Sequence, residues 1–486
     1  MAETFDSTTT PRQTIQSFAD LPTDVIDYIL DFLSPRALPK ACLLNKAIGV
    51  LAQKALYRDL FMPSPNRMLK CCETLLSNPA IAAVVRTVSV RFSANTETQS
   101  RSFYGVVEAT FLSLPDVLAL EILVSAPEFV HILAKCRWPR LHRFQSFLPT
   151  LPELLQFMGH HPTLHTTFFS WDYAELSTLP HIHLPNMEKF IGPAPLVPLV
   201  VPGSQADAVQ IVSRSSNTQL EAALAAVQGC TVPVTAFSML IEDWNFDQLH
   251  LVSTYLPHLT DLNIRNSWAG SEKSSSHMIF LRTIGPLLKN FTSLQNLTLN
   301  SEDKDHDDLS LFLSLLDIEA VIVGGFGLSC PQLSTCTMPS DTTWFKLQSC
   351  VWIPQNNRPK GRAWMRYVLD TGIHPVVKNL DDGTAEVIMA SIRKVLEDNP
   401  EWYGERADWD DDWAESDNES DSGYGYENVV REPLEDGEDE DADEDEDEDD
   451  EDDWETTDGE DQSDEAASEE EDGEGGDHHE EQVGTI

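Results

Sequence analysis

The sequence has little positive charge for its length. It contains 486 residues, with 32 Lys and Arg against 81 Asp and Glu, and its formal net charge at pH 7 is −49. No basic cluster elsewhere in the chain compensates for this excess. Because nucleic-acid phosphates repel acidic proteins, the composition argues against direct binding of DNA or RNA.

Patterns typical of disulfides, secretion and membrane spans are also missing. The eight cysteines include no CxxC pair, which favours buried, reduced thiols in an intracellular protein. The N-terminus lacks the apolar core of a signal peptide. The longest apolar stretch, residues 194 to 201, is short and is interrupted by Pro195 and Pro198, so we expect no membrane span. These absences predict a location in the cytoplasm, the nucleus or both.

Signatures of catalysis and of metal binding are absent as well. The sequence has no HExxH, GxSxG, P-loop or protein-kinase pattern. No cysteine or acid stands at ligand spacing beside the histidines that could otherwise suggest a metal site, so we interpret them as ordinary loop or core residues. These histidines are His160, His161, His165, His181 and His183.

A glycine-rich stretch follows an apolar run near residue 320. We predict a strand over residues 320 to 323 and a tight turn over the Gly-Gly-Phe-Gly sequence at 324 to 327. The turn does not fit the dinucleotide pattern GxGxxG, because Cys330 stands where the last glycine would be. We therefore expect a protein that is not an enzyme and needs no cofactor or metal.

The negative charge is concentrated at the C-terminal end. Residues 405 to 486 hold 42 acidic residues and two basic ones, so this segment carries −40 of the net charge of −49. Strong self-repulsion and little apolar surface predict that residues 401 to 486 are disordered. Trp409, Trp413 and Trp454 lie among the acids and could dock on basic partners. A tail that only solubilises the protein is the favoured alternative.

Residues 18 to 62 contain two stretches with apolar residues at helical spacing. The first ends at Ser34-Pro35, and the second runs from Ile48 to Leu56. A unit of about 40 residues is only marginally able to bury a core alone. The surplus of apolar residues predicts a docking surface, and it comprises Tyr28, Phe32, Leu43, Leu44, Leu60 and Phe61.

This segment resembles the F-box. The resemblance covers about 45 residues and rests on Leu21-Pro22, Asp24, the Ile29 to Leu33 step, Ser34-Pro35, Leu43-Leu44-Asn45-Lys46 and Tyr57-Arg58-Asp59-Leu60. Two features depart from the family pattern. Tyr57 stands where the family often carries Trp, and Pro39 lies inside the expected second helix. We interpret Pro39 as shifting the start of that helix, because a proline is costly only in a helix interior.

The resemblance implies binding to a Skp-type adaptor and, through it, to a cullin. By position in the family pattern, the adaptor would contact Leu21, Pro22, Val25, Ile26, Ile29, Leu30, Leu33, Leu43, Leu44 and Leu60. The alternative is a helical hairpin that only caps the following domain. The motif match favours docking, since analogy of fold alone would be weaker evidence.

A degenerate repeat runs through residues 63 to 400. A Pro-x-apolar segment recurs, and the apolar residue after Pro-x marks each repeat with spacings of 23 to 25 residues at first and of 35 and 39 later. These anchor residues are Val117, Leu141, Leu164, Met187, Val234, Leu259, Leu294 and Leu333, with a further repeat expected near residues 210 to 212. Strands that alternate with helices at this period are typical of leucine-rich repeats. The alternative is an α/β domain whose strands merely begin after prolines.

The last part before the tail differs from the repeats. We predict a helix over residues 384 to 398 with Val387, Ile388, Ile392, Val395 and Leu396 on one face, and we interpret this region as a cap on the repeat array. Its basic residues could receive an acidic partner or the tail, although a solvated rim is the favoured alternative. They are Arg358, Lys360, Arg362 and Arg366.

Together these patterns predict a multi-domain chain. We expect a disordered N-terminus (1–17), an all-α F-box unit (18–62), an irregular α/β leucine-rich-repeat-like solenoid (63–400) and the acidic tail (401–486). The resemblance implies the substrate-recognition subunit of a cullin-RING (SCF-type) ubiquitin ligase, which acts by proximity and not by its own chemistry. The alternative function is an acidic-tail scaffold or chaperone for basic proteins, with the F-box used outside ubiquitination.

Overall fold

The computed structural model describes residues 21–92, 100–169, 179–241, 244–267, 274–301, 309–348, 351–355, 359–372 and 382–398. Contacts divide the chain into two compact units, Met1–Asp408 and Trp409–Ile486. The expected disordered segments, residues 1 to 17 and 401 to 486, lie outside the described residues. The fold described below therefore belongs to the first unit.

A single long sheet organises this unit. Its thirteen described strands lie in the order of the sequence, and β1 to β11 are all parallel. The last two strands run antiparallel to their neighbours. The strands are β1 (Asp59–Met62), β2 (Thr87–Val90), β3 (Ala119–Ile122), β4 (Arg143–Ser146), β5 (Thr166–Phe169), β6 (Lys189–Gly192), β7 (Ala208–Ile211), β8 (Ala236–Ile241), β9 (Asp261–Asn266), β10 (Asn296–Ser301), β11 (Thr335–Thr337), β12 (Thr343–Gln348) and β13 (Val351–Pro354).

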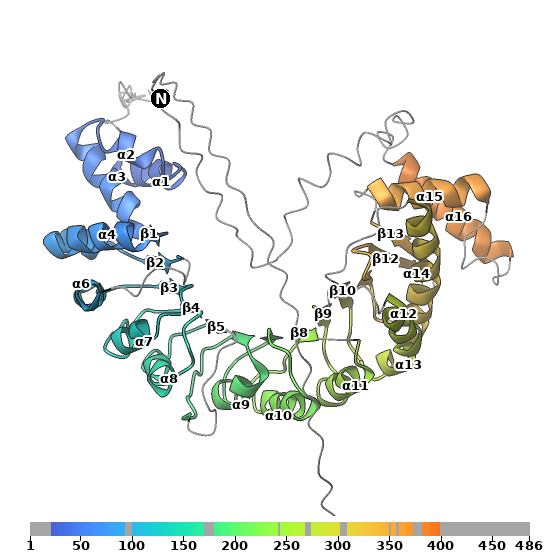
Figure 1. Cartoon of the computed structure of the whole chain (residues 1–486). Coiled ribbons are helices and arrows are strands. Elements are labelled where there is room, and N and C mark those ends of the chain that lie inside the picture. Colours follow the sequence, from blue (N-terminus) through green and yellow to red (C-terminus); the bar gives the residue numbers. More distant parts are fainter. Residues whose placement is uncertain are drawn as a thin grey trace, which may run out of the picture. The chain divides into compact units, whose positions relative to one another are not determined.

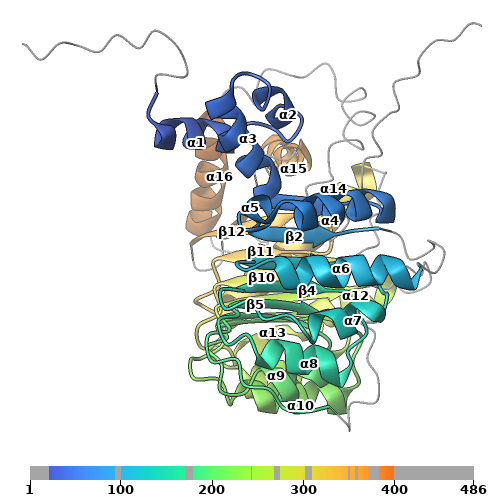
Figure 2. The same cartoon turned by 90° about the vertical axis from the view of Figure 1, so that its left-hand side faces the viewer.

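Helices connect most of the successive parallel strands and lie along one face of the sheet (Figures 1 and 2), whereas the described residues between β5 and β6 include no helix. The unit is therefore mixed α/β. The helices are α1 (Thr23–Asp31), α2 (Leu38–Ala41), α3 (Lys46–Arg58), α4 (Pro65–Ser77), α5 (Pro79–Ala82), α6 (Arg101–Ser113), α7 (Glu128–Leu133), α8 (Pro152–Gly159), the 3₁₀ turn η3 (Ala194–Leu196), α9 (Val197–Val200), α10 (Asn217–Val227), α11 (Phe246–Tyr255), α12 (Ser274–Thr283), α13 (Gly285–Leu288), α14 (Leu309–Ser329), α15 (Pro359–Thr371) and α16 (Asp382–Glu397).

The core lies between the sheet and these helices. Residues in register across the first eleven strands form one buried row, because side chains alternate between the two faces of a strand. This row is Leu60, Val88, Leu120, Phe144, Thr167, Phe190, Val209, Phe237, Leu262, Leu297 and Cys336. Each strand is too short to bury its apolar residues alone, so stacking of neighbours supplies the core.

The anchor residues of the sequence repeat occupy one equivalent place, just before each strand. All eight are buried. The residue after each anchor donates its backbone N–H to the carbonyl of the equivalent residue one repeat earlier, from Leu118 to Arg86 through to Ser334 to Gln295, with N···O distances of 2.7–3.0 Å. The further repeat expected near residues 210 to 212 is present as well, since β7 lies at residues 208 to 211. The predicted strand of every repeat is confirmed.

The prediction for residues 320 to 327 is wrong. These residues lie inside α14, so the expected strand and glycine turn are both replaced by helix. Apolar residues fill two sides of α14, and a run that is apolar all round has no period that distinguishes a strand from a buried helix. Residues 309 to 316 form the first part of the same helix.

The end of the array is an antiparallel hairpin followed by two helices. The predicted helix is present as α16, where Ile388, Ile392 and Leu396 are buried and Val387 is exposed, contrary to the prediction for that residue. The Trp344 and Trp364 rings pack edge to face, with their centroids 5.3 Å apart. Of the predicted basic residues, Arg358 lies outside the described residues, and the side chain of Lys360 is not described either.

No helix in the described part of the chain is both long enough and apolar enough to cross a membrane.

Candidate docking surface on the N-terminal helices

Three helices at the start of the described chain form a small unit with its own core. The core cluster consists of Ile26, Leu30, Leu38, Ala41 and Ala52, with Leu33 and Leu51 among its partly buried neighbours. It is separate from the core under the sheet, which begins at Leu60. The unit joins the sheet through α3, which runs directly into β1 and also contacts α5.

Local sequence explains where α1 and α2 begin. Pro22 precedes α1, and Asp24 lies in its first turn, where the positive end of the helix dipole favours an acid. Pro39 lies in the first turn of α2, as predicted, because the amides of a first turn have no partner within the helix. The side-chain oxygen of Asn45 accepts the backbone N–H of Ile48 at 2.8 Å and caps α3.

A close approach holds α3 against the turn that follows α2. A Cβ atom on Gly49 would stand 2.7 Å from the carbonyl oxygen of Cys42. Only glycine leaves room for this contact, since backbone atoms cannot give way as a flexible side chain would. The contact fixes the position of the turn that carries Leu43 and Leu44.

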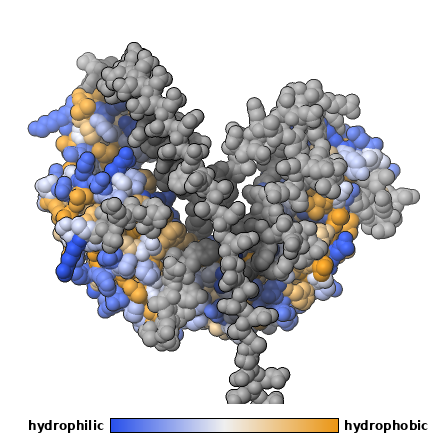
Figure 3. Space-filling model, in the orientation of Figure 1, coloured by the Kyte–Doolittle hydropathy of each residue, from blue (hydrophilic) through white to orange (hydrophobic). Residues whose placement is uncertain are grey.

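Large apolar side chains remain on the surface of this unit. Their exposed fractions range from 37 % to 86 %, and Leu43, in the turn between α2 and α3, has the highest. Apolar colour shows at the surface of this end of the molecule in Figure 3. The exposed residues are Val25, Tyr28, Phe32, Leu43, Leu44 and Val50.

The exposed residues of α1 follow a helical stripe. Val25, Tyr28 and Phe32 are three and four residues apart, so they share the side of α1 that faces away from Ile26 and Leu30. The rings of Tyr28 and Phe32 pack edge to face, with centroids 4.8 Å apart. This aromatic pair presents a preformed apolar surface to solvent.

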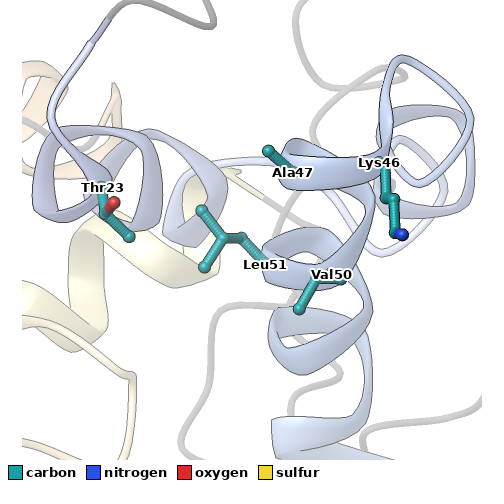
Figure 4. Close-up of a pocket in the computed structure, with 5 residues that line it drawn as sticks. All are labelled: Thr23, Lys46, Ala47, Val50 and Leu51. Atoms are coloured by element: carbon teal, nitrogen blue, oxygen red, sulfur yellow. The ribbon is translucent and has the colours of Figure 1, made fainter.

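A pocket of about 520 Å³ lies between the start of α1 and the first half of α3. In Figure 4, Thr23 comes from α1, and Leu51, Ala47 and Val50 come from α3, with the Lys46 side chain at the edge. The pocket lining is mostly apolar, which suits an apolar side chain of a partner better than a charged one.

The ten residues predicted to contact an adaptor fall into three groups. Pro22, Val25, Leu43 and Leu44 are exposed. Leu21, Ile29 and Leu33 are half-buried. The buried ones are Ile26, Leu30 and Leu60.

The buried members have structural roles in this chain. Ile26 and Leu30 belong to the core of the helical unit, and Leu60 lies in β1 and belongs to the core of the sheet. Residues expected to end the helical segment therefore form the first strand instead. Tyr28 and Phe32 were predicted as part of the apolar docking surplus but not among the ten adaptor positions, and Val50 was in neither set.

One ion pair ties the ends of the two longer helices together. The Arg58 guanidinium donates to the Asp31 carboxylate, with Nη1 and Oδ1 2.7 Å apart. Both side chains are well exposed, so the pair contributes at most about 1 kcal/mol. The pair lies where the end of α1 meets the end of α3.

Reactive groups elsewhere do not assemble into a site within the described residues. No group of three or more His, Cys, Asp or Glu side chains there could hold a metal ion. Burial raises the pKa of the Cys71 thiol to about 11 and that of Cys136 to about 12, so both stay protonated near neutral pH. His161 is buried and uses both ring nitrogens in hydrogen bonds to the backbone.

Comparison with known proteins gives little. No family model and no curated protein matches the chain. Among solved structures, a structural-genomics crystal structure of a Bacteroides fragilis protein is similar over 57 % of this chain, with 8 % sequence identity and a TM-score of 0.24. The match spans 66 % of that protein, just under two thirds of its length. Similarity at this level carries no argument about the fold or the function.

Proposed function

We propose that this protein is a substrate-recognition subunit of a cullin-RING ubiquitin ligase, in which residues 18 to 62 act as an F-box and bind a Skp-type adaptor. The observation that carries the proposal is the exposed apolar set on α1, on α3 and in the turn between α2 and α3. It lies in the segment whose residue order resembles the F-box. An apolar surface of this kind, built on a small helical unit, fits a protein partner.

The energetics of these residues support docking. Burying a Leu, Phe or Val side chain stabilises a complex by about 1.5–3 kcal/mol when it is fully exposed beforehand. Leu43, Leu44 and Phe32 are 86 %, 66 % and 72 % exposed, and a partner that covers them gains most of that amount. Such residues are poorly placed for any role inside the isolated chain.

The alternative, a hairpin that only caps the sheet, has less support. A cap would direct its surplus apolar residues toward the array that it covers. Instead, the contacts of α3 with β1 and α5 leave Leu43 and Leu44 in solvent. Leu43 and Leu44 are thus directed away from the sheet core, whereas Leu60 is the member of the predicted apolar surplus that joins it.

The sheet supplies the second half of the proposal. We infer that residues 63 to 400 form an irregular leucine-rich-repeat-like solenoid that selects the substrate. The stacked parallel strands, the buried row and the backbone ladder between repeats support this inference. The mechanism would be proximity, since a receptor on the ligase raises the local concentration of substrate lysines near the ubiquitin donor.

The test is calorimetric titration of the full chain with a Skp-type adaptor. The test variant carries Leu43→Asp and Leu44→Asp, two exposed positions where a charge leaves the fold of the free chain intact. The matched control is Leu112→Asp, an exposed leucine on α6. A buried charge costs several kcal/mol at an apolar interface, so the test variant should lose a micromolar complex.

Two results would overturn the proposal. One is an intact chain that does not bind the adaptor at all. The other is equal binding by the double variant and by the intact chain, with circular dichroism showing the same helix content in both. Loss of binding in the Leu112→Asp control would point to an effect on folding. Hydrogen exchange at α1 to α3 would then show whether the variants lose binding because these helices unfold or because the contact surface is changed.

A second candidate function rests on the charge of the C-terminal segment. Residues 405 to 486 carry −40, and such a segment attracts basic proteins. In this scaffold function, binding would weaken with added salt because exposed charges are screened. It would also survive the Leu43→Asp/Leu44→Asp change and be lost on deletion of residues 405 to 486.

A further inference from the structure

Helix α14 carries a second exposed apolar stripe, far in sequence from the docking surface described above. Within its described residues, the exposed positions are Ser314, Ile318, Val321, Gly325 and Leu328. They are alternately four and three residues apart. This spacing averages 3.5 residues, which is the period of a helix face that packs against another helix.

The stripe has no charge. The two acids in the middle of α14 point elsewhere: Asp317 accepts the indole N–H of Trp364 at 2.9 Å, and Glu319 is buried. The apolar members of the stripe are 37 % to 68 % exposed. Covering the stripe therefore removes apolar surface from water without the cost of burying a charge.

The stripe also has a notch. A Cβ atom added to Gly325 would have nothing within 4 Å, so the surface there is open. Ser314 is the other small residue of the stripe, and the large residues lie between and beyond these two positions. Large and small residues thus occur at matched distances on either side of Val321.

We propose that this face of α14 pairs with the same face of a second copy of the chain, with the two helices antiparallel around a two-fold axis near Val321. That axis places Ile318 of each copy opposite Gly325 of the other, and Leu328 opposite Ser314. Large side chains then face small ones at these two pairings, and Val321 faces its own copy at the axis. A two-fold interface requires this self-complementarity, because the same patch serves both partners.

Area and charge decide how strong the pair is. The stripe spans about 21 Å of helix, and three large side chains per copy cover much less than the roughly 800 Å² per partner of a stable specific interface. Each copy also carries a net charge of −49, so the copies repel each other at low salt. The dimer is therefore weak and reversible, and screening by salt strengthens it.

Sedimentation velocity of the full chain over a wide concentration range, at low and at high salt, tests the pairing. The intact chain should form a dimer at the highest concentrations, and more of it at high salt. Leu328→Glu should remain monomeric under all conditions. The control Leu112→Glu places the same charge at an exposed leucine on α6 and should dimerise like the intact chain.

An exchange of large and small residues tests the antiparallel geometry. Gly325→Ile alone fills the notch and should abolish the dimer, whereas Ile318→Ala combined with Gly325→Ile should restore it. Thermal unfolding of each variant shows whether the monomer is folded. An intact chain that stays monomeric throughout would overturn the proposal. So would a dimer that persists in folded Leu328→Glu, or failure of the folded exchange variant to recover.

Discussion

Two buried titratable residues, His161 and Glu319, oppose each other in the pH dependence of folding. Burial lowers the pKa of His161 to about 4. Burial raises the pKa of Glu319 to about 7, although its carboxylate accepts hydrogen bonds from Ser340 and Trp344. Each pKa shift changes the free energy of unfolding by about 3 kcal/mol over the pH range between the unfolded and the folded pKa.

The hydrogen bonds of His161 show why it must stay neutral. Its Nδ1 lies 2.7 Å from the carbonyl oxygen of Phe157, and its Nε2 accepts the backbone N–H of Trp138 at 3.0 Å. Protonation would turn Nε2 into a donor that faces another donor. Because the folded pKa lies below the unfolded value of 6.5, the stability is fully present above pH 6.5 and is lost as the pH falls toward 4.

The intact chain should lose stability on acidification through His161, and a variant without this histidine should lack that loss. We expect His161→Gln to be less stable than the intact chain at pH 7 and to approach it as the pH falls from 6.5 to 4.5. Urea unfolding of both proteins at each pH measures the difference and cancels the contribution of the many surface acids. A constant difference across this range would contradict the assignment.

Replacing Glu319 should have the opposite effect. The folded pKa lies above the ordinary value of 4.5, so the stability is present below pH 4.5 and is lost as the pH rises to about 7. Glu319→Gln keeps an acceptor for Ser340 and Trp344 without the charge. We expect it to match the intact chain near pH 4.5 and to exceed its stability by up to about 3 kcal/mol at pH 7.5. Urea unfolding measures this gain, and a variant that is no more stable at pH 7.5 would contradict it.

Among the helices, α3 packs so closely on the turn after α2 that a single added methyl group should lower the stability of the helical unit. Gly49→Ala would place its Cβ against the Cys42 carbonyl oxygen, and overpacking of this kind costs about 1–3 kcal/mol. We expect weaker adaptor binding as well, because the turn with Leu43 and Leu44 must shift. Urea unfolding and calorimetry measure the two effects.

A matched control is available on α6. A Cβ on Gly105 would have nothing within 4 Å, and Ala is favoured over Gly within a helix by about 1 kcal/mol. Gly105→Ala should thus leave stability unchanged or raise it slightly. Equal destabilisation by Gly49→Ala and Gly105→Ala would show that close packing at Gly49 does not cause the loss of stability in Gly49→Ala.

The elements also show what the sequence could predict. Strand positions followed from anchors such as Leu141 and Leu164, because each anchor is buried by the same contacts in successive repeats. The helix over residues 320 to 327 could not be predicted, since α14 is apolar on the side that meets the core and on much of the side that meets solvent. Only the positions of its neighbours decide between a strand and a helix there.

The docking surface was predictable in part for a similar reason. Sequence order identified Leu43 and Leu44, which lie in a turn and have no core to join. It did not separate Val25 from Ile26, because adjacent residues of a helix point in directions about 100° apart and only the packing of α1 on α3 shows which one faces inward. Leu60 was misassigned to the helical unit because its strand begins without a loop after α3.

At the scale of the whole first unit, two cores of unequal size predict two levels of stability. The core cluster of the helical unit has five buried residues, whereas the core under the sheet is continuous from Leu60 to Leu396. Regions with few buried contacts open at lower free energy than the global unfolding reaction. The helices α1 to α3 should therefore open while the sheet stays folded.

Hydrogen exchange measures this difference and links it to the proposed function. Backbone amides of α1 to α3 should exchange faster than those of β4 to β9, and Gly49→Ala should speed exchange in α1 to α3 but not in β4 to β9. A saturating adaptor should slow exchange in α1 to α3, because a partner that binds only the folded unit stabilises it by mass action. It should leave β4 to β9 unchanged. If α1 to α3 exchange as slowly as the central strands in the free protein, the two cores form one cooperative unit. The helices that carry the apolar surface then unfold only together with the sheet.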